Sequence, residues 1–161
     1  MSAAPAPRVR AAGRDDVPAL VALMGEFYAE AGYPLSADAA TRTFESLLAD
    51  PRLGAVWLAE DEDEGEQAGF VVLTLCFSME YGGMRGFVDD LFVRADCRGE
   101  GVASALVAAV RAECARRGVR ALYVEVGADN GAARRVYQGA GMADTGRLLL
   151  AAPLAVPVHD A

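Results

Sequence analysis

The sequence predicts a mixed α/β fold in one domain, and three observations support this. Two helical patterns and several apolar strand-like runs come first, and a strand, a helix and a second strand then follow one another between residues 86 and 126. A crossover of this length makes its two strands parallel. At 161 residues, the chain is long enough for one well-buried core but short for two. We therefore expect one domain over residues 8–152, with tails over residues 1–7 and 153–161.

The first part of the chain reads as an edge strand followed by two helices. Residues 8–11 suit a short strand. Apolar residues then recur at steps of three and four, which places them on one helical face: Val17, Leu20, Val21, Met24, Phe27, Tyr28 and Ala31. Asp15 or Asp16 can cap this helix, and Gly32 ends it. A second helix is expected to begin after Ser36 and to stop before Pro51.

Strand patterns dominate the middle of the chain. Residues 54–60 and 68–77 are apolar or β-branched runs, joined by an acidic stretch over 61–66 that we expect to be a hairpin loop. Residues 78–85 contain a double glycine and predict a turn. Simple alternation along the next strand predicts two faces, with Val88, Asp90 and Phe92 on one and Asp89, Leu91 and Val93 on the other.

The remaining elements complete the predicted fold. A helix is expected from Gly101 to Arg117, with Gly118 as its C-cap. We further expect a strand over residues 121–126, a helix over 132–140 that opens at Asn130, and a last strand over 146–152.

The composition excludes several classes of protein. The net charge is −8, and all 15 basic residues are arginines, which argues against broad nucleic-acid binding and is compatible with a cationic partner. No apolar run approaches the roughly 20 residues of a membrane span, so we expect no membrane partner and a cytoplasmic protein. The three cysteines have no metal-ligand spacing and the chain has one histidine, so we expect no metal site.

A glycine-bearing turn over residues 98–103, with sequence RGEGVA, lies between an apolar strand and a helix. Free N–H groups at a helix N-terminus bind phosphate oxygens, so we expect the backbone from Arg98 to Ser104 to hold an anionic cofactor. A Walker loop is excluded because the chain contains no lysine. The dinucleotide fingerprint G-x-G-x-x-G has Ser104 at its third glycine, although Glu125 lies at the required distance.

A third motif carries a family resemblance. Arg98, Gly101 and Ala103 match R-x-x-G-x-A, and a second set follows at Asn130, Ala133, Tyr137, Gly141 and Met142. With the strand ending Leu91-Phe92-Val93, these residues resemble the GNAT family of acetyl-coenzyme A-dependent N-acetyltransferases from about Gly86 to Met142. The resemblance implies a mostly antiparallel sheet, with helices on both faces and a splayed parallel strand pair that holds acetyl-coenzyme A. It implies cofactor contacts at Leu91, Phe92, Val93, Arg98, Gly99, Glu100, Gly101, Val102, Ala103, Ser104, Asn130, Ala133, Arg134 and Tyr137.

Two of these contacts have other readings. Asn130 suits a helix N-cap equally well, and Arg134 suits an ordinary solvated helix position.

Acidic residues and one tyrosine are the catalytic candidates. An aspartate within an apolar strand is costly unless it is hydrogen-bonded or protonated, and burial raises its pKa toward the range of a general base. Asp89 is the first candidate, followed by Asp90 and Glu80; a structural carboxylate is the alternative. Diamine acetyltransferases resemble this chain but tend to carry a glutamate at position 89, so the shorter aspartate favours a water relay. The family spacing makes Tyr137 the acid for the departing thiolate, and core packing is the alternative.

The acceptor is expected to be a small-molecule amine. Phe27, Tyr28, Tyr33 and Tyr81 stand where the resemblance implies an acceptor wall, although aromatic residues on a helix usually pack in a core. Dimers are frequent in the family, so a homodimer is also expected. Two alternatives remain: a non-catalytic acyl-coenzyme A sensor and a nicotinamide-dependent oxidoreductase. Cys97, next to Arg98 and a helix N-terminus, could have a lowered thiol pKa, but it has no histidine partner.

Overall fold

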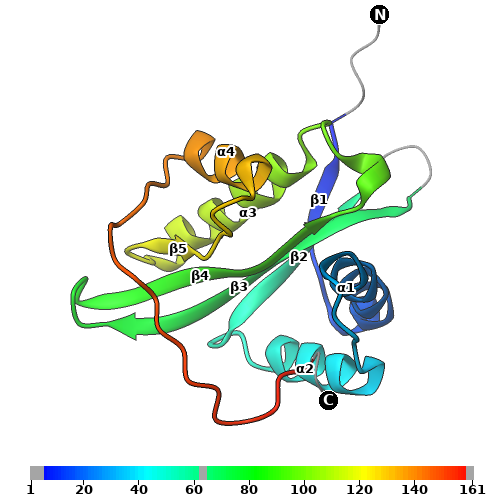
Figure 1. Ribbon diagram of the computed structural model, residues 1–161, viewed down its shortest axis with the longest axis horizontal. Helices are drawn as coiled ribbons and strands as arrows, with labels where there is room; N and C mark the ends of the chain where they lie inside the picture. The colour runs from blue at the N-terminus through cyan, green and yellow to red at the C-terminus, as the bar shows by residue number, and fades with distance from the viewer. Residues whose placement is uncertain (1–5, 62–64, 159–161) are drawn as a thin grey trace, which may run out of the picture.

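The computed structural model describes residues 6–61 and 65–158, which form a five-stranded sheet with helices on both faces (Figure 1). The strands follow one another across the sheet in the order β1 (Arg8–Ala11), β2 (Gly54–Glu60), β3 (Gln67–Ser78), β4 (Gly83–Val93) and β5 (Leu122–Val124). Successive strands from β1 to β4 pair antiparallel, whereas β4 and β5 are parallel. This arrangement confirms the predicted mixed sheet.

Local signals set the ends of the helices. The helix α1 (Val17–Ala31) ends at Gly32, and α3 (Val102–Arg117) ends at Gly118, both in the left-handed conformation that glycine tolerates. The helix α2 (Ala37–Ala49) begins after Ser36, whose hydroxyl accepts a hydrogen bond from the Ala39 N–H at 3.2 Å. The helix α4 covers Gly131–Gly139, and two single turns of 3-10 helix, η1 and η2, cover Arg14–Asp16 and Ala95–Cys97.

Two apolar clusters cover the two faces of the sheet. One joins the sheet to α1 and α2 through residues such as Leu20, Phe44 and Phe70. The other joins it to α3 and α4 through residues such as Leu106 and Tyr137. Each face therefore has its own core, and the sheet is the middle layer of three (Figure 1).

A β-bulge in β4 overturns the predicted assignment of side chains to faces. Val72 pairs with Asp90 while Leu73 pairs with Val88, so Asp89 is an extra residue in the strand. As a result, Val88 packs in the cluster under α3, whereas Phe92 packs in the cluster under α1. Simple alternation had placed these two side chains on one face and was wrong, because one inserted residue reverses every later position.

The parallel pair separates soon after it forms. Only Gly86, Phe87 and Val88 of β4 pair with β5, and the Met84 carbonyl accepts from the Arg120 N–H just before β5. From Asp89 to Val93, β3 is the only described strand that pairs with β4. The predicted strand over 121–126 is therefore shortened to Leu122–Val124. Beyond Val88, the two strands leave a gap that ends at the N-terminus of α3. This is the splayed pair that the resemblance implied.

The C-terminal part contains the clearest error of the sequence prediction. Residues 146–152 form no strand, and the side chains of Leu148, Leu149 and Leu150 are 90%, 64% and 89% exposed. The segment runs as irregular chain from α4 past β4 and β3 toward α2 (Figure 1). The turn before β4 is shorter than expected, because the strand begins at Gly83. The expected acidic loop includes residues 62–64, which lie outside the described residues.

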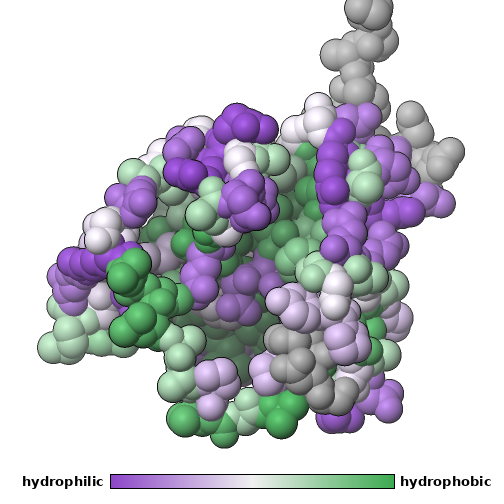
Figure 2. Space-filling model, viewed as in Figure 1, coloured by the Kyte–Doolittle hydropathy of each residue, from purple (hydrophilic) through white to green (hydrophobic). Residues whose placement is uncertain are grey.

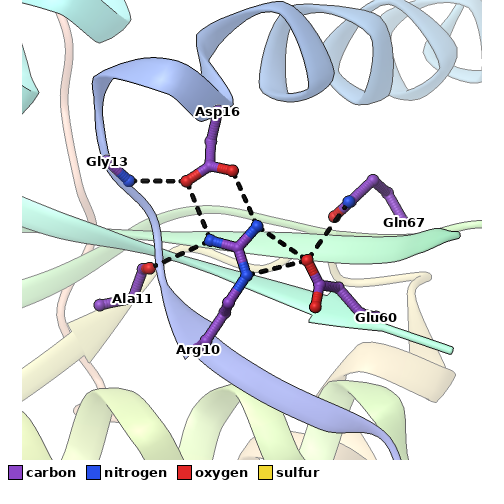
Figure 3. A network of polar contacts seen from close by, with 6 residues as sticks. All are labelled: Arg10, Ala11, Gly13, Asp16, Glu60 and Gln67. Atoms are coloured by element: carbon purple, nitrogen blue, oxygen red, sulfur yellow. Dashed lines mark hydrogen bonds and ion pairs between the residues drawn. The ribbon is translucent and has the colours of Figure 1, made fainter. Parts of the chain in front are cut away.

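A polar network fixes the first strand to the sheet (Figure 3). The Arg10 guanidinium donates to both carboxylate oxygens of Asp16, at 2.9 and 2.8 Å, and to Glu60 at 2.8 Å. Asp16 also accepts from the Gly13 N–H at 2.8 Å. Asp16 thus uses its side chain to hold the chain entering α1, and it makes no side-chain cap on the helix itself.

Candidate functional site

The glycine turn before α3 presents free backbone donors. Gly99 and Gly101 have φ angles of 80° and 82°, which residues with a Cβ rarely adopt. Within the described part of the chain, the N–H groups from Gly99 to Ser104 make no hydrogen bond. No acidic residue lies in the first turn of α3. The turn and the helix therefore form a site with positive potential that suits phosphate oxygens.

Arg98 faces its own protein. Its Nε donates to the Val93 carbonyl at 3.0 Å, one terminal nitrogen contacts a Glu30 carboxylate oxygen at 2.6 Å, and its guanidinium lies 5.9 Å from the centre of the Phe92 ring. In this arrangement, Arg98 ties the turn to β4 and α1. The backbone, rather than this side chain, supplies the free donors of the turn.

Asp89 and Asp90 lie side by side in β4 at the start of the gap. Burial, and then the neighbouring Asp89 carboxylate, raise the pKa of Asp90 to about 7. Burial also raises the pKa of Asp89, although much of its surface is exposed. A raised pKa and an exposed surface are compatible when water reaches the carboxylate from one side and protein surrounds it on the others. Neither carboxylate has a hydrogen bond or ion pair with a described residue.

Tyr137 comes from α4 and approaches the same carboxylates. Burial, and then Asp90, raise its pKa to about 12, so the phenol keeps its proton at neutral pH. The residue is only 8% exposed. Its hydroxyl makes no hydrogen bond with a described residue and is not sealed from solvent. The ring thus packs in the core while the hydroxyl remains available for a hydrogen bond.

Tyr28 approaches from the opposite layer. Burial, followed by Asp90 and Asp89, raises its pKa to about 12, so this α1 side chain lies within electrostatic range of both aspartates. Its neighbour Phe27 packs on Phe92, with ring centres 5.4 Å apart, and belongs to the core rather than to an open wall. Tyr33 follows α1 and is 53% exposed.

At the start of α4, Asn130 and Arg134 both make local contacts. Asn130 is the N-cap, because its side-chain oxygen accepts from the Ala133 N–H at 3.1 Å. Arg134 is exposed, and one of its terminal nitrogens donates to the Ala128 carbonyl at 3.3 Å. These contacts are local to the helix start.

Glu80 and Tyr81 lie apart from the aspartates, on the turn between β3 and β4. Both carboxylate oxygens of Glu80 contact Arg147, at 2.9 and 3.1 Å, and this partner lowers the pKa of Glu80. A low pKa and a bound guanidinium disfavour Glu80 as a general base. Tyr81 stands edge-on to Tyr123, with ring centres 6.3 Å apart.

The sequence analysis missed Arg85, Tyr123 and Arg147, which gather near Tyr81. The Arg85 guanidinium lies over the rings of Phe87 and Tyr123. Arg85 and Phe87 are two residues apart on one strand, so the sequence could have indicated that their side chains lie on the same face. The sequence could not predict that Tyr123 pairs with Phe87, because this pairing depends on the register of β5 against β4.

Figure 2 shows a hollow in this face of the molecule, over β3 and β4, bounded by α1 and α2 on one side and by the C-terminal segment on the other. Hydrophilic and hydrophobic surfaces meet at its floor. A separate depression of about 640 Å³ lies between α2 and β3, lined by residues such as Arg42, Ser46 and Thr74. That depression has no carboxylate in its lining, so it lacks a proton acceptor.

Two other kinds of chemistry find no support in the described residues. Burial, and then a hydrogen bond to Asp96, raise the pKa of the Cys97 thiol, so the lowered value that the sequence analysis considered and did not favour finds no support. No group of three or more His, Cys, Asp or Glu side chains within 6–61 and 65–158 is arranged to hold a metal ion. No helix in these ranges is both long and apolar enough to cross a membrane.

Comparison with solved structures finds the same fold in several proteins. An integron cassette protein from the mobile metagenome of Cole Harbour Salt Marsh is 50% identical, with 94% of this chain and 93% of that chain covered and a TM-score of 0.86. A predicted acetyltransferase from Clostridium acetobutylicum, crystallised with acetyl-CoA, is 20% identical, with 91% and 96% covered and a TM-score of 0.76. An aminoglycoside N-acetyltransferase, AAC(6')-Iy, in complex with CoA is 22% identical, with 92% and 95% covered and a TM-score of 0.76.

Sequence comparison gives one further result. No curated protein matches the chain. The family model described as the acetyltransferase (GNAT) family matches residues 19–142, which include the glycine turn, both aspartates and Tyr137. The chain therefore belongs to the GNAT family of acetyltransferases and is an acyltransferase that uses acetyl-coenzyme A.

Proposed function

We propose that the protein transfers the acetyl group of acetyl-coenzyme A directly to a small-molecule amine, with Asp90 as the general base and Tyr137 as the general acid. One observation carries this proposal. Asp90 is half-buried, has no partner among the described residues, has a pKa near 7, and lies within electrostatic range of the Tyr28 and Tyr137 hydroxyls. A carboxyl group in this state is suited to accept a proton at neutral pH.

The chain has groups that fit the coenzyme. The free N–H groups from Gly99 to Ser104 suit its diphosphate, and the two glycines with positive φ let the backbone approach closely. Next to them, β4 has a free edge. Arg94 N–H donates to the Ala68 carbonyl in β3, so the alternate residues Leu91 and Val93 direct their N–H groups into the gap. When bound there, acetyl-coenzyme A supplies an activated acetyl thioester.

The free N–H groups of β4 also suit a catalytic role. A backbone N–H can stabilise the negative charge that develops on the acetyl oxygen. Leu91 and Val93 are the candidates. Phe92 has the opposite parity and directs its N–H toward β3.

Proton transfers complete the reaction. The Asp90 carboxylate takes the proton from the ammonium group of the acceptor, directly or through one water molecule. The new bond joins the amine nitrogen to the acetyl carbon, the nitrogen releases its second proton to solvent, and the bond from that carbon to sulfur breaks. The Tyr137 hydroxyl gives its proton to the sulfur and regains one from solvent. Holding the amine and the thioester close together supplies much of the acceleration.

The charges near Asp90 favour a cationic acceptor. Asp89 and Asp90 both lack a cationic partner in the described chain, so an incoming ammonium group would meet two carboxylates. Asp89 is the more exposed of the two and is suited to attract the ammonium group, or to hold a bridging water.

Transfer is tested by measuring the thiol released when the protein, acetyl-coenzyme A and a panel of amines are mixed. The proposal expects release that depends on the amine and falls at least a hundredfold in Asp90→Asn. The sensor alternative expects tight binding of acetyl-coenzyme A with no release for any amine. An oxidoreductase would instead gain thermal stability from a nicotinamide dinucleotide.

We also propose a homodimer. Leu148, Leu149 and Leu150 leave a run of large apolar side chains in water, and β5 pairs on one edge only. Sedimentation of the native protein and of Leu149→Glu tests this point. A dimer that the substitution converts to a monomer agrees with the proposal, and a native protein that stays monomeric at high concentration contradicts it.

A further inference from the structure

Arg85 carries a charge that the described part of the chain does not neutralise. Four arginines are half-buried: Arg10, Arg85, Arg94 and Arg117. Three of them form ion pairs with carboxylates, but Arg85 forms none with a described residue. The sequence has 23 acidic and 15 basic residues, so carboxylates are not scarce. The hydrogen bond to Cys76 outweighs the effect of burial and raises the pKa of Arg85, so the guanidinium keeps its charge.

The guanidinium is held in place by neutral contacts. Its central carbon lies 5.2 Å from the centre of the Phe87 ring and 5.1 Å from that of Tyr123, and its Nε donates to the Cys76 sulfur at 3.3 Å. Stacking on two rings fixes the plane of the guanidinium and offsets part of its desolvation. The charge is therefore oriented before any ligand arrives.

The nearby carboxylate is already occupied. Arg85 contributes to lowering the pKa of Glu80, but both oxygens of Glu80 contact Arg147. Two guanidinium groups thus share one carboxylate, which leaves this end of the sheet positive in a protein of net charge −8.

The Arg85 guanidinium and Asp90 belong to the same face of the sheet. Phe87, under the guanidinium, pairs with Thr74 of β3, and Asp90 pairs with Val72. Arg85 itself pairs with Cys76, four positions from Val72, and its guanidinium extends along the strand as far as the Phe87 ring. The guanidinium therefore lies two to four strand positions from Asp90, or about 7 to 14 Å. One face thus has the Asp90 carboxylate and, at this distance, a guanidinium that contacts no carboxylate of a described residue.

We propose that Arg85 binds a carboxylate of the acceptor, so that the acceptor is a small amine with a carboxylate about 7 to 14 Å from its reacting nitrogen. The inference rests on the proposed acetyl transfer and names the class of its acceptor. The ammonium group would lie at Asp90 and the carboxylate at Arg85, where the planar fork of a guanidinium matches the two oxygens. The opposite orientation would place like charges together at both ends.

A matched pair of acceptors tests the inference. Nα-acetyl-lysine and its C-terminal amide have the same side-chain amine and differ in whether they present a carboxylate. We expect kcat/KM for the acid to exceed that for the amide by about tenfold to a hundredfold, the usual range for a charge-assisted hydrogen bond. In Arg85→Met, and in the more polar Arg85→Gln, this ratio should fall close to one.

Arg116→Met is the matched control. Arg116 is an exposed arginine of α3, on the other side of the sheet, and its removal lowers the net charge equally. It should keep the ratio of the native protein. A native ratio near one, or a high ratio that persists in both Arg85 variants, overturns the inference.

A binding measurement separates this inference from the proposed function. Calorimetric titration of the acid and the amide, with coenzyme A present, reports carboxylate recognition without turnover. Equal acetylation and equal binding of both compounds would keep the transferase and overturn the role of Arg85. Preferential, Arg85-dependent binding of the acid without acetylation would keep that role and refute the proposed transfer.

Discussion

Replacing Asp90 with asparagine should make the protein more stable and nearly inactive. The native pKa of about 7 lies roughly three units above the usual value of an aspartate. The folded state therefore binds an extra proton between about pH 4 and pH 7, and its stability falls as the pH rises through this window. Three units correspond to about 4 kcal/mol, and contact of the carboxyl with solvent reduces this to about 2 to 4 kcal/mol.

Asparagine keeps the shape of the side chain and has no charge to desolvate. At pH 8, Asp90→Asn should raise the free energy of unfolding by about 2 to 4 kcal/mol, and near pH 4 the gain should vanish. In the same variant, kcat/KM should fall by about 10² to 10⁴. The native enzyme should gain activity as the pH rises through an apparent pKa near 7, because the base must be deprotonated, and the variant should lose that inflection.

Denaturant unfolding at pH 4, 6 and 8 and a pH profile of kcat/KM measure both effects. Asp15→Asn removes an exposed aspartate and serves as the control, with little change in either quantity. If Asp90→Asn is less stable than the native protein at pH 8, the carboxyl does not carry a raised pKa. If activity and its pH profile survive the substitution, another group is the base.

Three further predictions concern the acid, the turn and the polar network. Tyr137→Phe should lower kcat by about tenfold to a thousandfold and leave the KM for acetyl-coenzyme A nearly unchanged, because the hydroxyl acts on the departing sulfur. Steady-state kinetics test this prediction. An unchanged kcat would mean that Tyr137 serves only in packing. Gly101→Ala should lower the free energy of unfolding by about 1 to 2 kcal/mol, because alanine disfavours a φ of 82°, and it should also weaken the binding of coenzyme A. Gly25→Ala, inside α1 with open space around it, should raise the free energy of unfolding by up to about 1 kcal/mol. Thermal unfolding measures the two changes in stability, and calorimetric titration measures the binding of coenzyme A. Arg10→Met should lower the free energy of unfolding by about 1 to 2 kcal/mol near neutral pH. Arg10 lowers the pKa values of Asp16 and Glu60, so the native protein should lose this stability as the pH falls through their titration, and the variant should show a flatter acid limb in urea unfolding.

The positions that the sequence predicted well depend on short-range physics. Gly32 and Gly118 end helices because they adopt positive φ, and Ser36 caps a helix three residues from its partner. The positive φ angles of Gly99 and Gly101 in the turn before α3 likewise suit the local sequence. Each of these features depends on residues that are close together in the sequence, so the sequence alone is enough to predict it.

Features that depend on pairing between residues far apart in the sequence were not predicted correctly. Apolar residues over 146–152 suited a strand, yet no described strand pairs with them, and an apolar pattern alone forms no ladder. Arg98 contacts Glu30, 68 residues earlier, and the sequence did not reveal this pairing. The partners of these residues lie far along the sequence, where local patterns carry no information.

The sequence by itself determined the class of the fold and the family, and it supplied the candidates for the cofactor turn and for the acid and base. The tertiary structure decided which of them act together. One extra residue at Asp89 turns Asp90 and Phe92 toward α1 and frees the edge of β4, and the register of β5 sets Tyr123 beside Arg85. Side-chain direction in a sheet has a period of two, so one bulge or one step of register reverses it, and only the paired strands reveal that step.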